Sequence, residues 1–422
     1  KYYMKIKEIA IVGLGYVGLP LAISLSKKYK VFGFDINKKR IKELKRNFDE
    51  TNEISKEQLK KSFKKGFSVS CEKDRLKQSN IYIITVPTPV NKKNKPELKP
   101  LLDACKTVGK NIKKGDIVVF ESTVYPGLTQ EICGNELQKH SGLNLEKDFF
   151  LGYSPERINP GDKIHTVDKI AKVISSENEN VKKILREIYS NVTNGKVFTA
   201  KNIMVAEASK VIENAQRDIN IAFINEVAKI CQKLNISVYD VLDASKTKWN
   251  FLPFYPGLVG GHCIGVDPFY LADVAKKHKV KPSVVLSGRK TNDEMSKFIY
   301  SQINKKIQKS SKILILGLTF KENVPDLRNS KVFDLIKYFK KSHEVYACDP
   351  LVGNIPEKKI KLICYENLKK HKFDVIILAV AHKLFIEFEI NKLITFLKKD
   401  GMIADLTGIW RDKKEIKNYW SL

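Results

Sequence analysis

Short apolar runs alternate with longer amphipathic segments along most of the chain. The runs at residues 8–12, 81–86 and 116–120 have the length and the β-branched content of strands that are buried on both faces. From residue 202 to residue 234, apolar side chains recur at helical spacing and predict one long amphipathic helix. Buried strands that alternate with helices are typical of an α/β fold with parallel sheets.

The order of apolar runs in the first third of the chain returns in the last third. The matching segments are 9–15 with 312–318, 31–35 with 345–349, and 81–86 with 374–380. We therefore predict two Rossmann-like, doubly wound parallel-sheet domains, joined by a long central helix and a helical domain. The predicted domains are residues 1–199, 200–300 and 301–422.

A glycine-rich turn follows the first predicted strand. The sequence GLGYVG at residues 13–18 stands between a strand and a helical run, which is the context of a dinucleotide-binding turn. Gly13 permits the turn, Gly15 lets a pyrophosphate reach the helix N-terminus, and Gly18 allows close packing of the helix on the strand. The first domain is therefore predicted to bind a dinucleotide cofactor.

Asp35, at the end of the next predicted strand, favours NAD over NADP. Its carboxylate would accept a hydrogen bond from the adenosine ribose 2′-hydroxyl and would repel a 2′-phosphate. The cations Lys38, Lys39 and Arg40 keep NADP open as the alternative, because they could pair with that phosphate.

The second Rossmann-like unit lacks the second and third glycines of this turn. It has Thr319, Phe320 and Lys321 there, so it is poorly suited to a dinucleotide pyrophosphate. The loop at residues 320–328 still offers an aromatic ring and two cations to a nucleotide.

Three polar loops follow predicted strands of the first domain. Because ligands bind at the carboxyl ends of parallel strands, Ser122 and Thr123 are candidates to hold a cofactor or an active-site water. Glu156 and Arg157 place an acid and a base side by side in a third such loop. In an arbitrary loop this pair would be surface charge, but its predicted position points to the cleft.

A thiol lies in the sequence GGHCIGVD at residues 260–267. Cys263 could act as a covalent nucleophile, and Asp267, about one helical turn further on, could influence it. A lone cysteine is more often an inert packing residue, and that interpretation stays open here. Lys210 and Asn214, one turn apart on the long helix, could bind an oxyanion or could form an exposed polar face. By themselves, they favour the exposed face.

Composition narrows the class of protein. The chain has 422 residues and a net charge of +29, but it contains few arginines, and its lysines are scattered over predicted helix faces. Readers of nucleic acid rely on arginine forks and aromatic platforms, so neither a nucleic-acid nor a membrane partner is expected. No apolar run has membrane-spanning length, and no secretory signal is expected. The 7 cysteines form no CxxC pair and no zinc spacing, so we expect a cytoplasmic protein without a metal.

Together, these motifs resemble those of the UDP-glucose/GDP-mannose 6-dehydrogenase superfamily over nearly the full chain. The motifs are VGLGYVGLPLA (12–22), TVPTP (85–89), ESTVYPG (121–127), SPERINPG (154–161), AEASKVIENAQRDINIAFINE (206–226), GGHCIGVDP (260–268) and GLTFKENVPDLRNS (317–330). His262 before the thiol, and the neighbouring sequence at 249–261, are most similar to the branch that oxidises UDP-N-acetylhexosamines.

The resemblance implies a four-electron oxidation of C6 of a UDP-N-acetylhexosamine, either UDP-GlcNAc or UDP-GalNAc, to the uronate with two NAD molecules. Cys263 would capture the C6 aldehyde as a thiohemiacetal, which the second oxidation converts to a thioester. Lys210 and Asn214 would stabilise the oxyanion. The product would be a precursor of a surface polysaccharide.

The resemblance also implies roles for the remaining site residues. Asp267 would take part in proton transfer, while Glu156 and Thr123 would position the water that hydrolyses the thioester. The implied cofactor-binding residues are Gly13, Gly15, Tyr16, Val17, Gly18, Asp35, Arg40, Thr88, Thr123 and Arg328. The implied substrate-binding residues are Glu156, Arg157, Lys210, Asn214, Tyr255, Gly257, Gly260, Phe320 and Lys321.

In this interpretation the three predicted domains bind NAD, form a homodimer or a higher homo-oligomer, and bind UDP, respectively. UDP-glucose and UDP-ManNAc remain alternative substrates. Two other classes stay open: a single-step NAD alcohol dehydrogenase with a structural Cys263, and a non-catalytic lysine-rich binding protein.

Overall fold

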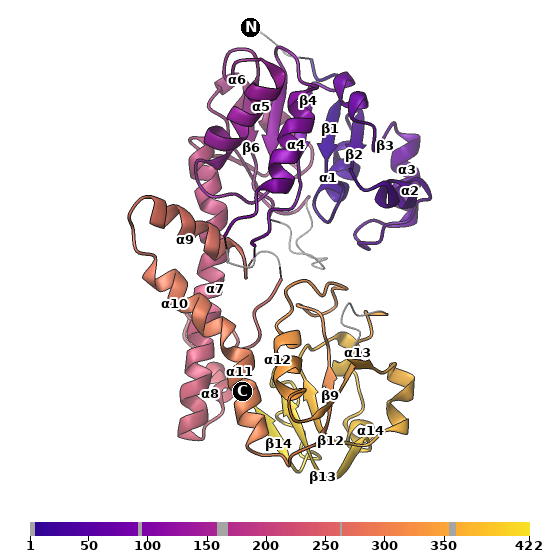
Figure 1. Cartoon of the computed structure of the whole chain (residues 1–422), viewed down its shortest axis with the longest axis vertical. Coiled ribbons are helices and arrows are strands. Elements are labelled where there is room, and N and C mark those ends of the chain that lie inside the picture. Colours follow the sequence, from indigo (N-terminus) through magenta and orange to yellow (C-terminus); the bar gives the residue numbers. More distant parts are fainter. Residues whose placement is uncertain (1–4, 92–94, 158–167, 262–263, 354–359) are drawn as a thin grey trace. The chain divides into compact units, whose positions relative to one another are not determined.

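The computed structural model describes the chain except for residues 1–4, 92–94, 158–167, 262–263 and 354–359. The described chain divides into two compact units (Figure 1). Unit 1 comprises Lys1–Glu213 and Phe269–Val280, and unit 2 comprises Asn214–Pro268 and Lys281–Leu422. The predicted three-part division at residues 199 and 300 stays a prediction.

Unit 1 contains a parallel six-stranded sheet with the strand order β3-β2-β1-β4-β5-β6. Its strands are β1 (Ile9–Val12), β2 (Val31–Phe34), β3 (Ser68–Ser70), β4 (Ile81–Ile84), β5 (Ile117–Phe120) and β6 (Phe150–Tyr153). All five strand pairs run parallel, and the four central strands are completely buried. The predicted Rossmann-like sheet is therefore confirmed, and β1 lies between β2 and β4.

The helices of unit 1 begin where short polar side chains can cap them. Asn37 and Asn178 accept hydrogen bonds from backbone N–H groups in the first turns of α2 and α6, and Ser55 forms a capping box with Gln58 at the start of α3. The helices are α1 (Gly18–Leu25), α2 (Lys38–Lys45), α3 (Lys56–Lys64), α4 (Lys99–Gly109), α5 (Asn135–Ser141) and α6 (Glu179–Ser190). The unit also has two 3-10 or π helices, η1 (Lys73–Gln78) and η2 (Thr129–Gly134), and a two-stranded sheet of β7 (Lys172–Ile174) and β8 (Val197–Thr199).

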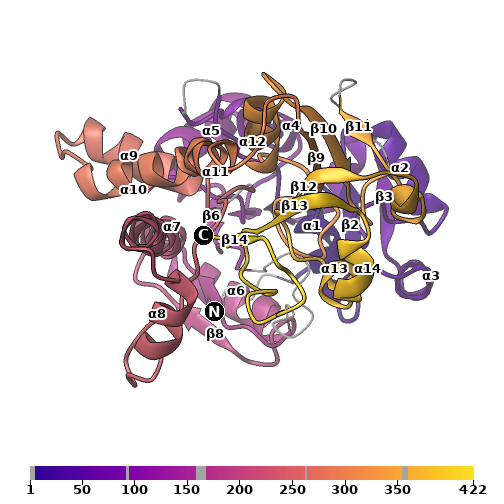
Figure 2. The same ribbon diagram turned by 90° about the horizontal axis from the view of Figure 1, so that it is seen from below.

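Unit 2 repeats this topology with the strand order β11-β10-β9-β12-β13-β14. Its strands are β9 (Lys312–Leu316), β10 (Glu344–Cys348), β11 (Lys361–Leu362), β12 (Phe373–Leu378), β13 (Leu397–Asp405) and β14 (Tyr419–Ser421). Alternate residues of β9 face opposite layers. Ile313 and Ile315 pack with α11 (Met295–Asn304) and α12 (Val332–Phe339), whereas Leu314 and Leu316 pack with η3 (Tyr365–Lys370), α13 (Lys383–Ile386) and α14 (Ile390–Ile394). Figure 2 shows the second sheet between these two groups of helices.

The predicted long helix is confirmed as α7 (Ile203–Leu234), which runs without a break through 32 residues. Beside its second half pack α8 (Val238–Ser245) and α10 (Ser283–Asp293) (Figure 1). A Cβ atom added at Gly288 would lie 3.4 Å from Ile219, so glycine there lets α10 approach α7 closely. The helix α9 (Asp267–Lys277) begins with the last residue of the GGHCIGVD stretch.

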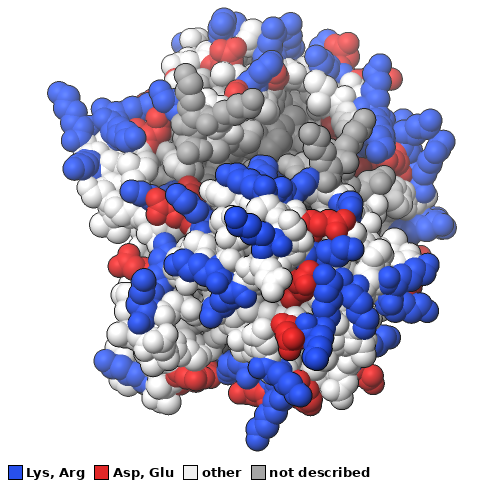
Figure 3. All heavy atoms as spheres, turned by 60° about the horizontal axis from the view of Figure 1, so that its bottom comes forward, with Lys and Arg blue, Asp and Glu red and all other residues white. Residues whose placement is uncertain are grey.

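Two surface properties bear on the expected partners. Among the described residues, no helix is long and apolar enough to cross a membrane. Figure 3 shows Lys and Arg side chains spread over the face it presents, with Asp and Glu among them. The positive charge on this face is therefore distributed rather than gathered in one groove.

A buried carboxylate ties together the amino ends of the strands in unit 1. Glu8 is 1% exposed, and Arg75 donates to both of its carboxylate oxygens, at 2.6 and 2.8 Å. Burial by itself would raise the pKa of Glu8, but hydrogen bonds from Arg75, Lys30 and Ser79 outweigh it and leave the pKa lowered. Glu8 therefore stabilises the folded state above its ordinary pKa, and this stabilisation is lost as the pH falls through the lowered value.

We expect Glu8→Gln to lower the free energy of unfolding by ~2 kcal/mol at pH 7, because it leaves part of a buried charged cluster unsatisfied. Urea unfolding followed from pH 7 to pH 3 should show the difference from wild type shrinking as Glu8 becomes protonated. Asp74→Asn, which removes the exposed pair with Lys77, is the control and should leave stability unchanged. A difference independent of pH would contradict the role assigned to Glu8.

Candidate active site

The glycine-rich turn has the geometry that its sequence predicts. Gly13 has a φ of 99°, and a Cβ atom at Gly18 would lie 1.9 Å from the carbonyl oxygen of Gly13. A Cβ atom at Gly15 would meet nothing within 4 Å, so this side of the turn is open. Between β1 and α1 there is thus tight packing at Gly18 and open space at Gly15, which suits a dinucleotide pyrophosphate.

Asp35 and Arg40 form hydrogen bonds with the backbone of this turn at Leu14. The Asp35 carboxylate accepts hydrogen bonds from the N–H groups of Leu14 and Asn37, both at 2.8 Å. Arg40 is 4% exposed, donates to the carbonyl of Leu14 at 2.9 Å and pairs with Asp49 at 2.8 Å. The Arg40 guanidinium is therefore buried and paired with Asp49, and its contact with a cofactor stays a prediction.

The loops after β4 and β5 are joined at the carboxyl edge of the sheet. The Thr88 hydroxyl donates to the carbonyl of Thr123 at 2.7 Å, and the Ser122 hydroxyl donates to the carbonyl of Val86 at 2.6 Å. The phenol of Tyr270, which is fully buried, donates to the carbonyl of Thr88 at 3.1 Å. Two predicted cofactor residues, Thr88 and Thr123, are thus brought together and anchored to α9.

A buried lysine joins two carboxylates from neighbouring loops. Lys172 is completely buried, and its ammonium donates to Glu121 at 2.6 Å and to Glu156 at 2.7 Å. The Tyr189 hydroxyl donates to the other oxygen of Glu121. Burial raises the pKa of Glu121 to about 7, although Lys172 and Tyr189 act against this shift. Glu156 therefore does not face solvent as a surface charge; it is 7% exposed.

A second buried carboxylate supports the loop that carries Thr123. Glu207 of α7 accepts hydrogen bonds from the N–H groups of Gly127 and Thr129, at 2.6 and 2.9 Å. Burial raises its pKa to about 7, against the effect of these donors. One turn further along α7, Lys210 is only 7% exposed. The interpretation of Lys210 as part of an exposed polar face is therefore wrong, because its side chain is buried.

The Arg157 side chain has other partners than the Glu156 carboxylate. Its guanidinium pairs with Glu213 of α7 and donates to the carbonyl of Ala171 at 3.3 Å. Its predicted contact with substrate stays a prediction.

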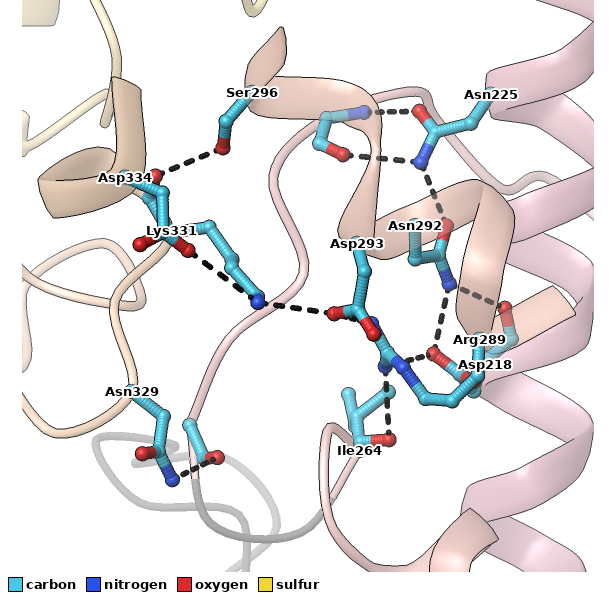
Figure 4. Close-up of polar contacts among 12 residues, drawn as sticks. Asp218, Asn225, Ile264, Arg289, Asn292, Asp293, Ser296, Asn329, Lys331 and Asp334 are labelled. Atoms are coloured by element: carbon cyan, nitrogen blue, oxygen red, sulfur yellow. Dashed lines mark hydrogen bonds and ion pairs between the residues drawn. The ribbon is translucent and has the colours of Figure 1, made fainter. Parts of the chain in front are cut away.

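In unit 2, a network of fully buried side chains holds the segment before the thiol (Figure 4). Asn225 of α7 donates to the carbonyl of Gly257 at 3.1 Å and accepts from its N–H at 2.8 Å. Asn225 also donates to Asn292, which donates to the carboxylate of Asp218 at 2.8 Å. Predicted substrate residue Gly257 is thus clamped to α7 at both of its backbone polar groups.

The same network also contacts the backbone that follows residues 262–263. Arg289 is 2% exposed and donates to Asp218 at 2.6 Å, to Asp293 at 3.1 Å and to the carbonyl of Ile264 at 3.5 Å (Figure 4). Lys331 pairs with Asp293 at 2.9 Å and links the network to the start of α12. The backbone on each side of residues 262–263 is therefore tied to α7 and α10.

The glycine pair before the thiol has a structural reason that the sequence did not reveal. A Cβ atom at Gly260 would lie 2.5 Å from the carbonyl oxygen of Asn329, and one at Gly261 would lie 2.7 Å from the ring of Phe320. Gly261 also has a φ of 85°. In the structure these glycines admit the loop at 320–329, with Asn329 against Gly260 and the ring of Phe320 against Gly261.

Two further members of the predicted catalytic set meet in unit 2. The Asn214 amide donates to the carboxylate of Asp267 at 2.5 Å, and Asp267 is 2% exposed at the start of α9. Lys210 and Asn214 lie about one turn apart in the unbroken α7. Cys263, the predicted nucleophile, lies outside the described residues.

The remaining predicted residues have mixed surroundings. Tyr255 is 50% exposed, with the Lys246 ammonium 4.8 Å from its ring. Arg328 pairs with Asp326 at 2.6 Å, and the carbonyl of Lys321 accepts from Thr319 at 2.8 Å. Contacts of Tyr16, Val17, Arg328, Tyr255 and Lys321 with ligands stay predictions. Among the described residues, no group of three His, Cys, Asp or Glu could hold a metal ion.

Sequence reasoning missed the buried partners. Lys172 and Arg289 lie outside every motif, and Glu207 and Asn225 lie within the motif at 206–226 without a signal that separates them from surface residues of the same type. A lysine at the start of an apolar strand and a glutamate on the apolar face of a helix were the available signals, and neither identifies a partner.

Sequence models of the UDP-glucose/GDP-mannose dehydrogenase family match the chain in three stretches. The NAD binding domain matches residues 7–193, the central domain matches 204–294, and the UDP binding domain matches 314–412. The three matches follow the order of the two Rossmann-like sheets and the helical segment between them.

Similar proteins span nearly the whole chain. Protein CapL of Staphylococcus aureus is 48% identical over 417 residues, which are 96% of each chain. The UDP-N-acetyl-D-glucosamine 6-dehydrogenase of Pseudomonas aeruginosa is 44% identical over 98% of this chain and 100% of its own. A solved structure of the UDP-D-ManNAc dehydrogenase from Pyrococcus horikoshii superposes with a TM-score of 0.87 at 28% identity, covering 98% of both chains.

Proposed function

The chain belongs to the UDP-glucose/GDP-mannose dehydrogenase family of NAD-dependent enzymes, and from this membership we propose that it oxidises C6 of a UDP-N-acetylhexosamine to the uronate. The observation that carries the proposal is the hydrogen bond between Asn214 and Asp267. It joins the α7 face that bears Lys210 to the residue four positions after Cys263. A thioester mechanism requires a thiol together with an amide, an ammonium and a carboxylate, and Cys263, Asn214, Lys210 and Asp267 are groups of these types.

UDP-GlcNAc is the first candidate substrate, with UDP-GalNAc as the C4 epimer. A relative named for UDP-N-acetyl-D-glucosamine is 44% identical to this chain, whereas the structure named for UDP-D-ManNAc is 28% identical. UDP-ManNAc and UDP-glucose are therefore alternatives. That the product supplies a surface polysaccharide stays a prediction.

The turn of residues 13–18 would hold NAD, which would supply the acceptor for the hydride removed from C6 in each of the two oxidations. The thiolate of Cys263 adds to the C6 aldehyde, and oxidation of the resulting thiohemiacetal gives a thioester. Lys210 and Asn214 donate hydrogen bonds to the oxyanion that forms at C6. Asp267, held by Asn214, exchanges protons with Lys210 or with a water.

Glu156 and Thr123 act in the last step, in which water hydrolyses the thioester. The Glu156 carboxylate accepts a proton from the attacking water, and Thr123 orients that water. Gly257, Gly260, Phe320 and Lys321 are proposed to hold the UDP-sugar, with Tyr255 and Arg157 at its edges. The backbone of Gly257 is held by Asn225, and Arg289 donates to the carbonyl of Ile264 further along the chain (Figure 4).

The two remaining classes make different predictions from this one. A single-step alcohol dehydrogenase would yield one NADH per sugar and would not need Cys263. A lysine-rich binding protein would show salt-sensitive binding to nucleic acid and no affinity for NAD.

We propose that the protein forms a homodimer through α7. Val205, Ile212, Phe223, Ile230 and Leu234 are each at least 47% exposed, and their spacing of 7, 11, 7 and 4 residues places them on one stripe of the helix. In a dimer with two-fold symmetry, the stripe of one copy would be buried against the same stripe of the second copy.

The first experiment counts NADH per sugar consumed for purified wild type and Cys263→Ser with UDP-GlcNAc, UDP-GalNAc, UDP-ManNAc and UDP-glucose. Wild type should yield two NADH per uronate on an N-acetylhexosamine. Cys263→Ser should form no uronate while binding NAD normally, because the thioester cannot form. Near-normal steady-state turnover by Cys263→Ser would exclude the covalent mechanism.

The second experiment removes the buried ammonium. Lys210→Ala should lower kcat by about two to three powers of ten, as loss of other oxyanion donors does. UDP-sugar affinity, measured by calorimetry, should change much less, because the nucleotide is held elsewhere. Arg217→Ala, an exposed cation on the same helix, is the control with kcat near wild type. A loss confined to binding would remove Lys210 from the catalytic set.

The third experiment tests the stripe on α7. Phe223→Glu should halve the mass measured by light scattering, because a buried charge is costly at the centre of an apolar interface. Lys233→Glu, which changes the charge of an exposed residue off the stripe, should leave the mass unchanged. A monomeric wild type, or a Phe223→Glu protein with the wild-type mass, would contradict the proposed dimer.

A further inference from the structure

We infer that Lys172 is a positioning residue that holds the Glu156 carboxylate ionised and oriented for hydrolysis of the thioester. The inference rests on the proposed function, in which Glu156 accepts a proton from the attacking water. It adds a residue that lies outside every motif of the sequence analysis.

The contacts of Lys172 point to this role. Its ammonium lies 2.7 Å from Oε2 of Glu156, while Oε1 of Glu156 accepts from the N–H of Arg157 at 2.6 Å. Each carboxylate oxygen thus has a donor at a defined position, which sets the orientation of the group. Lys172 itself lies at the start of β7, where its N–H donates to the carbonyl of Lys196 at 2.9 Å. The ammonium therefore projects from a fixed backbone.

The charges of the cluster explain why a lysine is needed there. A carboxylate that is 7% exposed, such as Glu156, would take up a proton unless a cation were near. Among the described residues, the titratable groups that face Lys172 are Glu121 at the end of β5, Glu156 after β6, and Tyr189 of α6, whose ring lies 5.6 Å from the ammonium. Neighbouring carboxylates raise the pKa of Lys172 against the effect of burial. The ammonium stays charged.

Glu121 takes a different part from Glu156. It lies at the end of the sheet with 2% exposure, and the hydroxyl of Tyr189 occupies its second oxygen. Its pKa of about 7 allows it to be neutral when Glu156 is charged. The Lys172 ammonium then pairs with one ionised carboxylate, that of Glu156. Its hydrogen bond to Glu121 fixes the position of the ammonium.

In the hydrolytic step, water adds to the thioester carbonyl carbon and its proton passes to Glu156. The C–S bond then breaks, Glu156 gives that proton to the Cys263 thiolate, and the second proton of the water is released to solvent, so that the uronate leaves as a carboxylate. Water is the only co-reactant, and no electrons are transferred. Loss of Lys172 should slow this step alone, because both oxidations precede it.

The test is Lys172→Met, which keeps the length of the side chain and removes the charge. With UDP-GlcNAc and NAD, rapid mixing should show a burst of two NADH per active site, followed by steady turnover about 100-fold slower than wild type. KM for the sugar should stay within a few fold. Mass spectrometry of the quenched protein should show the acyl adduct on Cys263. The burst counts folded sites, so partial unfolding does not disturb the result.

The pH dependence separates positioning from a structural role. Without the ammonium the pKa of Glu156 rises, so the acidic limb of the hydrolysis rate should move to higher pH by a unit or more. Arg75→Met, which breaks the Glu8 pair at the opposite edge of the same sheet, is the matched control. It should lower stability and leave the pH profile of hydrolysis unchanged.

A double variant tests whether Lys172 only neutralises Glu121. Glu121→Gln alone should retain hydrolysis, because its amide oxygen still accepts from Lys172. Lys172→Met with Glu121→Gln removes the ammonium together with the ionisable group of Glu121, and it should still accumulate the acyl-enzyme. Recovery of wild-type turnover by the double variant would overturn the inference, as would Lys172→Met with unchanged kcat. One NADH per sugar from wild type would instead overturn the proposed function, and this role with it.

Discussion

Parallel strands that all end at one edge of a sheet are the constraint on which the site of unit 1 depends. The turn after β1, the loop after β4, the loop after β5 and the loop after β6 leave the sheet side by side, because every neighbouring pair is parallel and in register. Residues as distant in the chain as Gly13, Thr88 and Glu156 are therefore gathered at the same edge. The short strands are buried on both faces, so the loops rise from a rigid base.

Burial of polar groups near this edge has a cost that the structure meets with specific partners. Unpaired, the carboxylates of Glu121 and Glu207 would lose hydration without compensation. Lys172 and Tyr189 donate hydrogen bonds to Glu121, and two backbone N–H groups donate to Glu207. Such pairs are rarely the best source of stability, because hydrophobic groups of equal volume would fold as well. Their value lies in fixing the orientation and the charge of groups that do chemistry.

In unit 2, buried polar side chains also provide hydrogen-bond partners for backbone groups. The described residues on either side of 262–263, namely 251–261 and 264–266, contain glycines and prolines and form no helix or strand before α9. Asn225, Arg289 and Asn329 hold it by its peptide groups, at Gly257, Ile264 and Gly261 respectively. A polar network that is satisfied by backbone groups rigidifies a loop without filling the space that a ligand needs. The long helix α7 therefore serves as a scaffold as well as a carrier of Lys210 and Asn214.

The sequence by itself determined the two Rossmann-like sheets, the long helix and the dinucleotide turn, because each rests on local patterns: apolar period, turn glycines and strand-end acids. Ordered motifs also sufficed to predict the family and the types of catalytic group. Only the tertiary structure decided which polar residues are buried and which partners they have. Lys172 and Lys210 look like the many surface lysines of a highly charged chain, and Arg40 looks like an exposed cation. Burial depends on what packs against a residue from distant parts of the chain, and that information is not local.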